Sequence, residues 1–392
     1  MRFPEFSGEW DHISLSDIAD IVGGGTPDTS VVEYWGGNIQ WFTPSEIGKE
    51  KYARLSERTI TEAGIKNSSA KLLPRGTVLL SSRATIGECS IARQECTTNQ
   101  GFQSLIAETD KVTSEFLYYL VPTIKKEMLR RSCGSTFLEI SANELRKIYV
   151  YRPYLIEQNK LAEFMSLLDL RIETQKKIIE DLKKLKDAIN NSLHNNINEF
   201  QLFSFNELGN DYSGLTGKSS EDFGSGLPYI SYLNVFRNDI VTDESFDYVK
   251  VSKTEKQNVV SYGDLLFTLS SETPSEVGIG AIYLGKTNPI YLNSFCFGVH
   301  LSNQENIYGL YLAYFVTSQY FRKTILPFAQ GSTRYNLMKS DFMKHKFRFP
   351  NMATQKAIYN ALQTLSEKIQ NEEVCLNKYT EQKQYLLARL FI

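Results

Sequence analysis

The sequence repeats itself, and an internal repeat constrains a fold more than any single motif does. The tripeptide Gly134-Ser135-Thr136 recurs as Gly331-Ser332-Thr333, so the two copies are offset by 197 positions. The same offset relates further matched residues: Pro153 and Pro350, Gln158 and Gln355, Lys147 and Lys344, and the basic pairs Lys125-Lys126 and Arg322-Lys323. Matches at one offset over a short stretch predict two modules of equivalent architecture. They disfavour one catalytic domain with an accessory domain.

The repeat extends upstream with a looser register, as insertions would cause. Gly76 in LLPRGTVLLSS corresponds to Gly263 in VVSYGDLLFTLSS, and IQWFTPSEI (39–47) resembles LPYISYLNV (227–235). A chain of 392 residues is long enough for two domains. The predicted organisation is two globular regions, each followed by a helical segment, with these boundaries: 1–153 and 154–197 in the first half, 198–350 and 351–392 in the second.

Each globular region is predicted to be of the α+β class. Short apolar runs such as TVLLSS, ECSIAR, DLLFTLS and GIGAIYL are bounded by Gly, Pro, Asn and Ser, which is the pattern of short strands and turns. Residues 114–131 and 306–325 have the composition of helices, and each contains one of the duplicated basic pairs. The globular regions are therefore expected to be mainly β with some helix.

The helical segments have the heptad spacing of a coiled coil. In the first segment the two seam positions hold Leu161, Leu168, Gln175, Leu182 and Ile189, and Met165, Ile172, Ile179, Lys186 and Leu193. In the second segment they hold Ile358, Leu365, Glu372, Tyr379 and Leu386, and Leu362, Ile369, Leu376, Lys383 and Leu390. Because the polar interruptions recur at corresponding places, the two helices are expected to pair with each other. Two amphipathic helices that pack only on their own domains remain an alternative.

The direction of the pairing decides what the molecule can do. A helix of about 37 residues rises roughly 55 Å. Antiparallel helices would place one module at each end with pseudo-two-fold symmetry, and the modules would reach duplex sites on the order of 10–15 base pairs apart. Parallel helices would bring the two modules together instead. We expect the antiparallel coiled coil.

Charge and cysteine content narrow the functional class. The formal net charge is -2, which excludes a simple polybasic nucleic-acid binder but allows a local basic face. The five cysteines are scattered without a CxxC pair, which suits a reducing compartment and offers neither a zinc site nor a disulfide framework. No apolar run approaches the length of a membrane span, and the start MRFPEFSGEW has no apolar signal region. We expect a cytoplasmic protein that contacts no membrane.

The order of motifs resembles the specificity subunits of type I restriction–modification systems, and the resemblance covers essentially the whole chain. The segments on which it rests are FPEFSGEW (3–10), LSDIADIVGGGTP (15–27), the stretch IQWFTPSEI, both LLSS-type strands, NQGFQSL (99–105), both Gly-Ser-Thr loops, and the related stretches 152–173 and 349–370. None of these motifs is specific alone, but their order occurs twice.

The resemblance implies a function. Each globular region would be a target-recognition domain that reads one half of a split sequence in double-stranded DNA. The helices would set the spacer and help to dock two methyltransferase (modification) subunits, and restriction subunits would add translocation and cleavage. The specificity subunit would have no chemistry and bind no cofactor, so S-adenosylmethionine, ATP and Mg would belong to the partner subunits.

Catalytic motifs are missing from the sequence, which agrees with a non-catalytic role. There is no NPPY-like tetrapeptide of an aminomethyltransferase and no HExxH pattern. The stretch TGKSS (216–220) lacks the upstream glycine of a Walker A loop, because Tyr212 occupies that position. The glycines of GGGTP (23–27) lack the spacing of a dinucleotide-binding loop and are expected to form a turn.

Candidate DNA contacts fall into two classes, because phosphate contacts position a protein and base-edge contacts specify sequence. For phosphates we expect the duplicated basic pairs Lys125, Lys126, Arg322 and Lys323, with Lys147 and Lys344 as weaker candidates; a solvated helix face is the alternative. For bases we expect polar side chains in loops and at strand ends: Thr43, Ser45, Arg83, Asn99, Gln100, Gly134, Ser135, Thr136, Ser231, Asn234, Asn293, Gly331, Ser332, Thr333 and Arg334. Arg334 is suited to a bidentate contact with guanine. For each of these, a structural hydrogen bond is the alternative.

The two modules are expected to read different sequences, because the second copy has no arginine in the region that matches Arg83. Both modules contain the Gly-Ser-Thr loop, and its residues either contact DNA or stabilise the loop. A symmetric two-headed scaffold that binds proteins and no nucleic acid is the alternative function. A stand-alone enzyme is disfavoured by the missing motifs.

Overall fold

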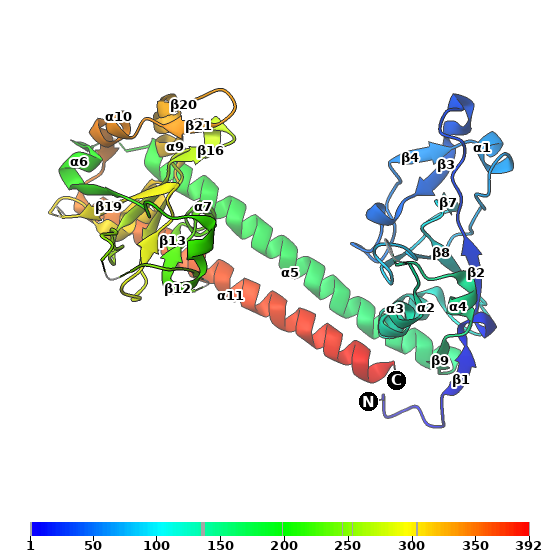
Figure 1. Cartoon of the computed structure of the whole chain (residues 1–392). Helices are drawn as coiled ribbons and strands as arrows, with labels where there is room; N and C mark the ends of the chain where they lie inside the picture. The colour runs from blue at the N-terminus through cyan, green and yellow to red at the C-terminus, as the bar shows by residue number, and fades with distance from the viewer. Residues whose placement is uncertain are drawn as a thin grey trace. The chain divides into compact units, whose positions relative to one another are not determined.

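The computed structural model describes residues 2–134, 138–197, 199–244, 246–252, 254–302 and 305–391. The chain divides into two compact units (Figure 1). Unit 1 contains residues 1–176 and 374–392, and unit 2 contains residues 177–373. Two long helices, α5 (Leu155–Asn195) and α11 (Met352–Leu390), each contribute one part to each unit.

Unit 1 is built on a four-stranded sheet in the order β2-β8-β5-β6 and a three-stranded sheet in the order β4-β3-β7, with β1 paired to β9. Its strands are β1 (Asp11–Ser14), β2 (Ala19–Gly23), β3 (Trp35–Phe42), β4 (Arg58–Ile60), β5 (Val78–Leu80), β6 (Cys89–Ile91), β7 (Cys96–Thr98), β8 (Gln103–Ala107) and β9 (Tyr149–Arg152). Its short helices are α1 (Glu62–Lys66), α2 (Ser114–Leu120), α3 (Lys125–Arg131) and α4 (Ala142–Arg146), with 3-10 turns η1 (Leu15–Asp17), η2 (Val32–Tyr34), η3 (Pro44–Glu46) and η4 (Val121–Ile124).

Unit 2 has a five-stranded sheet in the order β11-β19-β15-β17-β13, two three-stranded sheets in the orders β14-β12-β18 and β16-β21-β20, and the pair β10-β22. Its strands are β10 (Gln201–Phe203), β11 (Gly209–Ser213), β12 (Phe223–Ile230), β13 (Ile240–Val241), β14 (Asp247–Val249), β15 (Leu265–Thr268), β16 (Ser270–Ser271), β17 (Gly280–Tyr283), β18 (Tyr291–Leu292), β19 (Cys296–Leu301), β20 (Ala329–Gln330), β21 (Tyr335–Leu337) and β22 (Phe347–Phe349). Its helices are α6 (Phe205–Leu208), α7 (Tyr232–Arg237), α8 (Leu312–Phe315), α9 (Gln319–Ile325) and α10 (Lys339–Lys344), with 3-10 turns η5 (Ser220–Asp222), η6 (Pro274–Glu276), η7 (Gly309–Tyr311) and η8 (Leu326–Phe328).

The two units share a topology, as the repeat predicts. The central strand β5 pairs antiparallel with β6 and β8, and β15 pairs antiparallel with β17 and β19. A parallel pair also lies at corresponding places in the two units, β3 with β7 and β12 with β18, and unit 2 has a further parallel pair, β13 with β17. The α+β class with two tandem, similarly built domains is confirmed.

The helices expected over 114–131 and 306–325 are each interrupted. Residues 114–131 form α2, the 3-10 turn η4 and α3, because Pro122 has no backbone N–H to continue the α-helical hydrogen bonds. Residues 306–325 form η7, α8 and α9. The chain turns at residues 316–318 between α8 and α9, and the Ser318 hydroxyl caps α9 by accepting from the Phe321 N–H at 3.2 Å.

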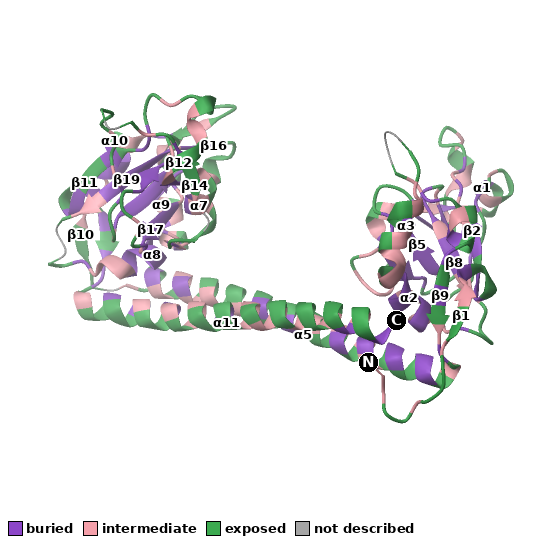
Figure 2. Ribbon diagram, turned by 60° about the horizontal axis from the view of Figure 1, so that its bottom comes forward, coloured by how far each residue is buried: buried purple, intermediate pink, exposed green. Residues whose placement is uncertain are grey.

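The core of unit 1 joins the sheet to both long helices. Leu161 and Met165 of α5 and Leu386 and Leu390 of α11 belong to the same buried cluster as the sheet residues of that unit. The ring of Phe391 stacks on Phe116 of α2 with centroids 5.2 Å apart. Figure 2 shows this concentration of buried residues in the sheets, whereas much of the surface of the long helices is exposed.

The pairing of α5 with α11 in unit 1 is antiparallel. Lys383 forms an ion pair with Asp169 at 2.5 Å, and Arg171 donates to the Tyr379 hydroxyl at 2.8 Å. The position along α5 rises as the position along α11 falls, which is the signature of opposite directions.

Unit 2 gives the same result from different residues. Lys183 near the end of α5 pairs with Glu373 of α11 at 2.7 Å. Leu193, at the end of α5, packs on the buried cluster that contains Ile358 at the start of α11. The expected antiparallel pairing of the two helices is confirmed within each unit.

Two lysines at seam positions of the long helices, Lys186 and Lys383, lie where a long helix meets a globular region. Lys186 pairs with Asp239 at 2.6 Å and lies 5.1 Å from the centre of the Tyr314 ring. Lys383 pairs with Asp169 and lies 6.0 Å from the centre of the Tyr119 ring. Each seam cation is therefore neutralised by an acid of its own unit and lies beside a corresponding tyrosine. Among the described residues, no helix is both long and apolar enough to cross a membrane.

Candidate nucleic-acid interface

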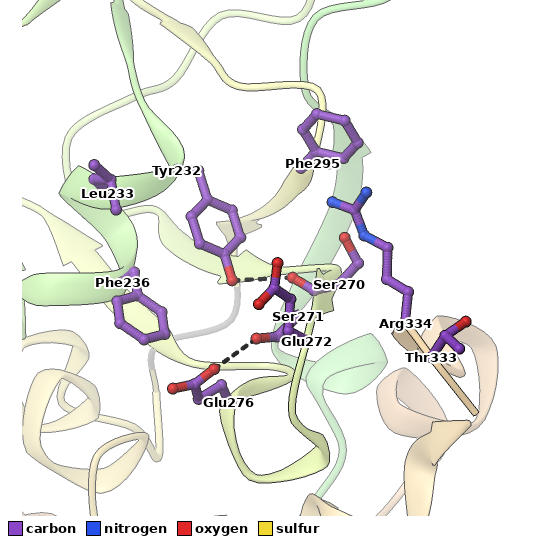
Figure 3. Close-up of a pocket in the computed structure, with 10 residues that line it drawn as sticks. All are labelled: Tyr232, Leu233, Phe236, Ser270, Ser271, Glu272, Glu276, Phe295, Thr333 and Arg334. Carbon is purple, nitrogen blue, oxygen red and sulfur yellow. Dashed lines mark hydrogen bonds between the residues drawn. The ribbon is translucent and has the colours of Figure 1, made fainter. Parts of the chain in front are cut away.

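Unit 2 contains a cleft of about 720 Å³ that gathers residues from four distant parts of the sequence (Figure 3). Its walls come from α7, from the segment after β15, from the loop before β19, and from the loop between β20 and β21. The lining residues are Tyr232, Leu233, Phe236, Ser270, Ser271, Glu272, Glu276, Phe295, Thr333 and Arg334. The fold thus assembles apolar, acidic and basic side chains that the sequence keeps up to about a hundred residues apart.

One wall of the cleft consists of Arg334 and Phe295. The Arg334 guanidinium carbon lies 5.1 Å from the centre of the Phe295 ring, within cation–π range, and the Phe295 side chain is 50% exposed. Leu233 and Phe236 lie on the other side of the cleft in Figure 3, and Leu233 is also 50% exposed. The cleft therefore offers a ligand both exposed apolar surface and the hydrogen-bond donors of a guanidinium.

The floor of the cleft contains hydroxyl and carboxyl groups. The Tyr232 hydroxyl donates to the Ser270 carbonyl at 2.9 Å, and the Ser271 hydroxyl donates to Glu276 at 2.8 Å. The hydrogen bond from Ser271 is the main reason that the pKa of Glu276 is lowered, with a second contribution from Thr273. The Ser270 hydroxyl is buried and has no hydrogen-bond partner among the described residues.

The loop that presents Arg334 depends on Gly331. Its φ of +146° lies in a region that side chains rarely adopt, and a Cβ there would meet the Arg334 carbonyl oxygen at 2.0 Å. Gly134 has the corresponding conformation in unit 1, with φ +133°. The glycine of the shared tripeptide is therefore required by the loop itself. Ser135 and Thr136 lie outside the described residues, whereas Ser332 and Thr333 are exposed.

Both units hold the end of the central strand in the same way. The N–H of Ser82 donates to the Gly101 carbonyl at 2.8 Å in unit 1, and the N–H of Leu269 donates to the Phe295 carbonyl at 2.8 Å in unit 2. The side chain that follows differs: Arg83 comes after Ser82, and Ser270 comes after Leu269. The same backbone framework therefore presents different side chains in the two units.

Arg83 is not free in unit 1. Its guanidinium forms an ion pair with Glu139 at 2.5 Å, and the two residues form an isolated β-bridge. An arginine paired with a carboxylate is held in place, but it must exchange that partner before it can bind a base bidentately. Arg334, the arginine of the unit 2 cleft, is not the counterpart of Arg83, because it lies in the loop between β20 and β21 and not at the end of the central strand.

Most of the polar candidates hold their own loops together. Thr43 and Ser231 cap η3 and α7, through hydrogen bonds with Glu46 and Asn234, respectively. Asn99 accepts from the N–H two residues later at 2.8 Å, and Asn293 does the same at 2.9 Å. Gln100 accepts from Thr26 at 2.5 Å, and Ser45 is exposed within hydrogen-bond distance of Thr43. These duplicated turns explain why similar residues recur at both sites.

The first members of the basic pairs clamp a turn in their own unit. Lys125 pairs with Glu88 at 2.8 Å. Arg322 donates to the carbonyls of Ser275, Val277 and Gly278 at 2.7–2.8 Å, and burial lowers the pKa of Arg322 to about 10. Arg322 is bound to three backbone carbonyls, which makes it a weaker candidate for a phosphate contact than its exposed neighbour Lys323.

The second members, Lys126 and Lys323, point to solvent. They follow the two clamping cations directly, so a common local fold presents them. Lys147 pairs with Glu144 at 2.6 Å, and Lys344 is exposed. Lys126 and Lys323 therefore remain the best candidates for contacts with phosphate.

Sequence reasoning missed Tyr232, Leu233, Phe236, Glu272 and Phe295 as cleft residues. The available signal was weak, since an aromatic residue in a short strand run usually belongs to the core. The expected turn at GGGTP is not present: Gly23 ends β2 and residues 24–27 continue without a turn, and a Cβ at Gly24 would meet the Asn99 carbonyl oxygen at 2.0 Å, so the missing side chain at Gly24 serves packing. Among the described residues, no group of three or more His, Cys, Asp or Glu side chains is arranged to hold a metal ion.

Comparison with known proteins gives the family. Residues 7–184 and 187–379 each match the family model described as the type I restriction modification DNA specificity domain. The MjaIX specificity subunit of a type I restriction enzyme from Methanocaldococcus jannaschii is 42% identical over 181 residues, which cover 45% of this chain. The matched stretch spans only 42% of that relative's length.

Solved structures agree on the fold. One similar chain comes from a structure that addresses complex assembly and conformational transition of the type I R-M system. The match covers 98% of this chain and 97% of that chain, with a TM-score of 0.65 and 14% identity. The S subunit of a type I restriction-modification system from M. genitalium covers 100% of this chain and 99% of its own, with a TM-score of 0.53 and 15% identity. Because two consecutive copies of the domain occupy nearly the whole sequence, this chain belongs to the type I restriction modification DNA specificity family.

Proposed function

We propose that the chain is the sequence-specific DNA-binding subunit of a type I restriction–modification complex and is not itself an enzyme. Each globular region reads one half of a bipartite target in double-stranded DNA. The paired helices set the spacer between the half-sites and dock two methyltransferase subunits. Residues 1–153 and 198–350 are the target-recognition domains in this proposal, and 154–197 and 351–392 are the spacer helices.

One observation carries the proposal: the two units share a backbone framework but differ in the side chains that this framework presents. The hydrogen bonds of Ser82 with Gly101 and of Leu269 with Phe295 are equivalent. Beside them lie an ion-paired Arg83 in unit 1 and the cleft with Arg334 in unit 2. Duplicated scaffolds with different reading residues are what recognition of two different half-sites requires.

Phosphate contacts are assigned to Lys126 and Lys323, with Lys125 as a further candidate once it releases Glu88. Base contacts are assigned to the loops around the strand ends, principally Arg83 in unit 1 and Thr333 and Arg334 in unit 2. The capping and turn residues position these loops and contribute to DNA contact as a set.

Partner subunits supply the chemistry in this proposal. The methyltransferase subunits bring S-adenosylmethionine, and the restriction subunits bring ATP and Mg. The chain itself carries no cofactor and acts in the cytoplasm, where it meets DNA. It binds DNA weakly alone and tightly once the methyltransferase subunits are docked.

The test is selection of duplexes from a randomised pool by the chain purified together with its methyltransferase subunits. We expect a bipartite motif with a constant spacer, and affinity that falls steeply with salt because phosphate contacts release counterions. Equal affinity for every duplex at physiological salt contradicts the proposal. Binding that is insensitive to salt favours a protein-binding scaffold instead.

A further inference from the structure

The unit 2 cleft contains a cation whose donors are available. Arg334 is exposed, and its guanidinium carbon lies 5.1 Å from the centre of the Phe295 ring, which favours an orientation beside that ring. Among the ion pairs of the described residues, none involves Arg334. A guanidinium that is oriented by an aromatic ring and keeps its N–H groups free can donate two parallel hydrogen bonds to a planar acceptor pair.

The same cleft contains an anion that does not neutralise Arg334. Glu272 is exposed and lies between the two walls in Figure 3. Its carboxylate forms no ion pair with any described residue. The neighbouring Glu276 differs, because its carboxylate accepts the Ser271 hydroxyl and is held in place by the loop. Glu272 is therefore the carboxylate of this cleft that is available to a ligand.

These charges exclude some ligands. Phosphate groups would be repelled by Glu272 and Glu276, so the cleft is unsuited to the DNA backbone. A ligand must instead offer a pair of acceptors to Arg334 and an amino donor to Glu272. The major-groove edge of a G·C pair offers this combination: guanine N7 and O6 accept, and the cytosine N4 amino group donates.

A buried hydroxyl group, that of Ser270, is a second sign of a ligand site. The Ser270 side chain is only 4% exposed, lines the cleft, and has a hydroxyl without a hydrogen-bond partner among the described residues. Buried hydroxyls are nearly always paired, so this one is a group for which a ligand or water supplies the partner. Phe295 and Leu233 add exposed apolar surface on which a base edge can rest.

We propose that this cleft reads one G·C base pair in the major groove, with Arg334 contacting the guanine and Glu272 contacting the amino group of the paired cytosine. The inference rests on the proposed DNA-reading function and names the base pair that unit 2 recognises. Unit 1 reads its half-site differently, because Arg83 occupies the place of Ser270 and is paired with Glu139.

The experiment repeats the selection from randomised duplexes with Arg334 and Glu272 variants of the full chain in complex with its methyltransferase subunits. R334A is expected to lose the preference for guanine at one position of one half-site by roughly 5- to 140-fold, which is the discrimination of a bidentate contact. R334K keeps the charge but cannot form the bidentate contact, so it is expected to lose the same preference. E272A is expected to relax the cytosine requirement at the same base pair.

Arg237 provides the matched control, because it is an exposed arginine at the end of α7 that does not line the cleft. R237A is expected to leave the selected motif unchanged. Thermal melting of each variant checks folding, and R334K preserves the stem of the side chain should R334A perturb the loop.

The outcomes separate the two proposals. If the wild-type complex selects no motif, the proposed function fails. If the wild type selects a motif and R334A and R334K keep its guanine preference, the assignment of Arg334 is overturned. A uniform loss of affinity for all duplexes also overturns it, because that result marks a phosphate contact. An E272A complex that keeps the cytosine preference overturns the assignment of Glu272.

Discussion

Gln158 and Gln355 hold the same place in the two units: each is fully buried and donates at 2.8 Å to the carbonyl of the proline five residues earlier. Each also accepts a hydrogen bond from a backbone N–H of its globular region, Thr113 at 3.0 Å for Gln158 and Tyr308 at 2.8 Å for Gln355. The pair therefore ties the start of each long helix to the module that precedes it.

Replacing Gln355 by leucine is expected to destabilise unit 2 by at least about 2 kcal/mol, because buried backbone groups lose their partners. Hydrogen–deuterium exchange with mass spectrometry should show faster exchange in unit 2 and little change in unit 1. Gln370, exposed on the same helix, is the control, and Q370L is expected to have little effect. Equal exchange in wild type and Q355L would contradict the role assigned to the glutamine.

Arg322 is expected to stabilise unit 2 and not to contact phosphate. R322M removes the donors that hold the carbonyls of Ser275, Val277 and Gly278, and a loss of about 3 kcal/mol in the stability of unit 2 is expected from hydrogen bonds to a charged group. Chemical denaturation followed by exchange in unit 2 measures the loss. The slope of log affinity against log salt should not change below the unfolding transition, and a reduced slope would show that Arg322 contacts phosphate.

The neighbouring Lys323 should behave in the opposite way. K323A is expected to leave stability unchanged, to weaken binding to all duplexes alike, and to reduce the slope of log affinity against log salt by about 1. Titrations at several salt concentrations give the slope. K378A, which removes an exposed lysine of α11, is the control. An unchanged slope in K323A would remove this lysine from the phosphate contacts.

Unit 2 should be sensitive to acid through His194. Burial lowers the pKa of His194 to about 4, and its Nδ1 lies 2.8 Å from the Asn190 carbonyl. The unfolded chain therefore binds a proton at higher pH than the folded chain, so stability falls as the pH drops from about 6.5 towards 4, by up to about 3 kcal/mol.

Melting temperatures measured across this range in wild type and in H194L isolate the contribution. The wild type should lose stability more steeply than the variant, whose leucine cannot be protonated. Parallel pH profiles for the two proteins would show that His194 does not carry the effect.

The repeat made the architecture predictable, because equivalent modules must bury equivalent residues. Gln158 and Gln355 follow from the offset, and so do the glycines of the two loops, whose backbone conformations match. The heptads predicted the pairing of the long helices, since apolar residues at that spacing need a partner along their length. The break between α8 and α9 was missed, because Ser318 acts as a cap only when the chain turns there.

The candidate site was predictable only in part. The sequence pointed to Thr333 and Arg334, but Phe295 and Glu272 became cleft residues only through the packing of strands from different parts of the chain. Duplicated charge at Lys125 and Arg322 indicated a shared role, and the structure shows that each side chain binds a turn of its own unit. The partners that decide this lie 37 and 44–47 residues away.

By itself, the sequence determined that there are two modules, that each is followed by a long apolar-seamed helix, and that the modules differ in their polar loops. Periodicity and repetition can be recognised in the sequence without knowledge of three-dimensional contacts. The tertiary structure decided which polar groups are already satisfied and which remain available. Hydrogen bonds and ion pairs form between groups that folding brings within about 3 Å, and linear distance along a chain does not specify that proximity.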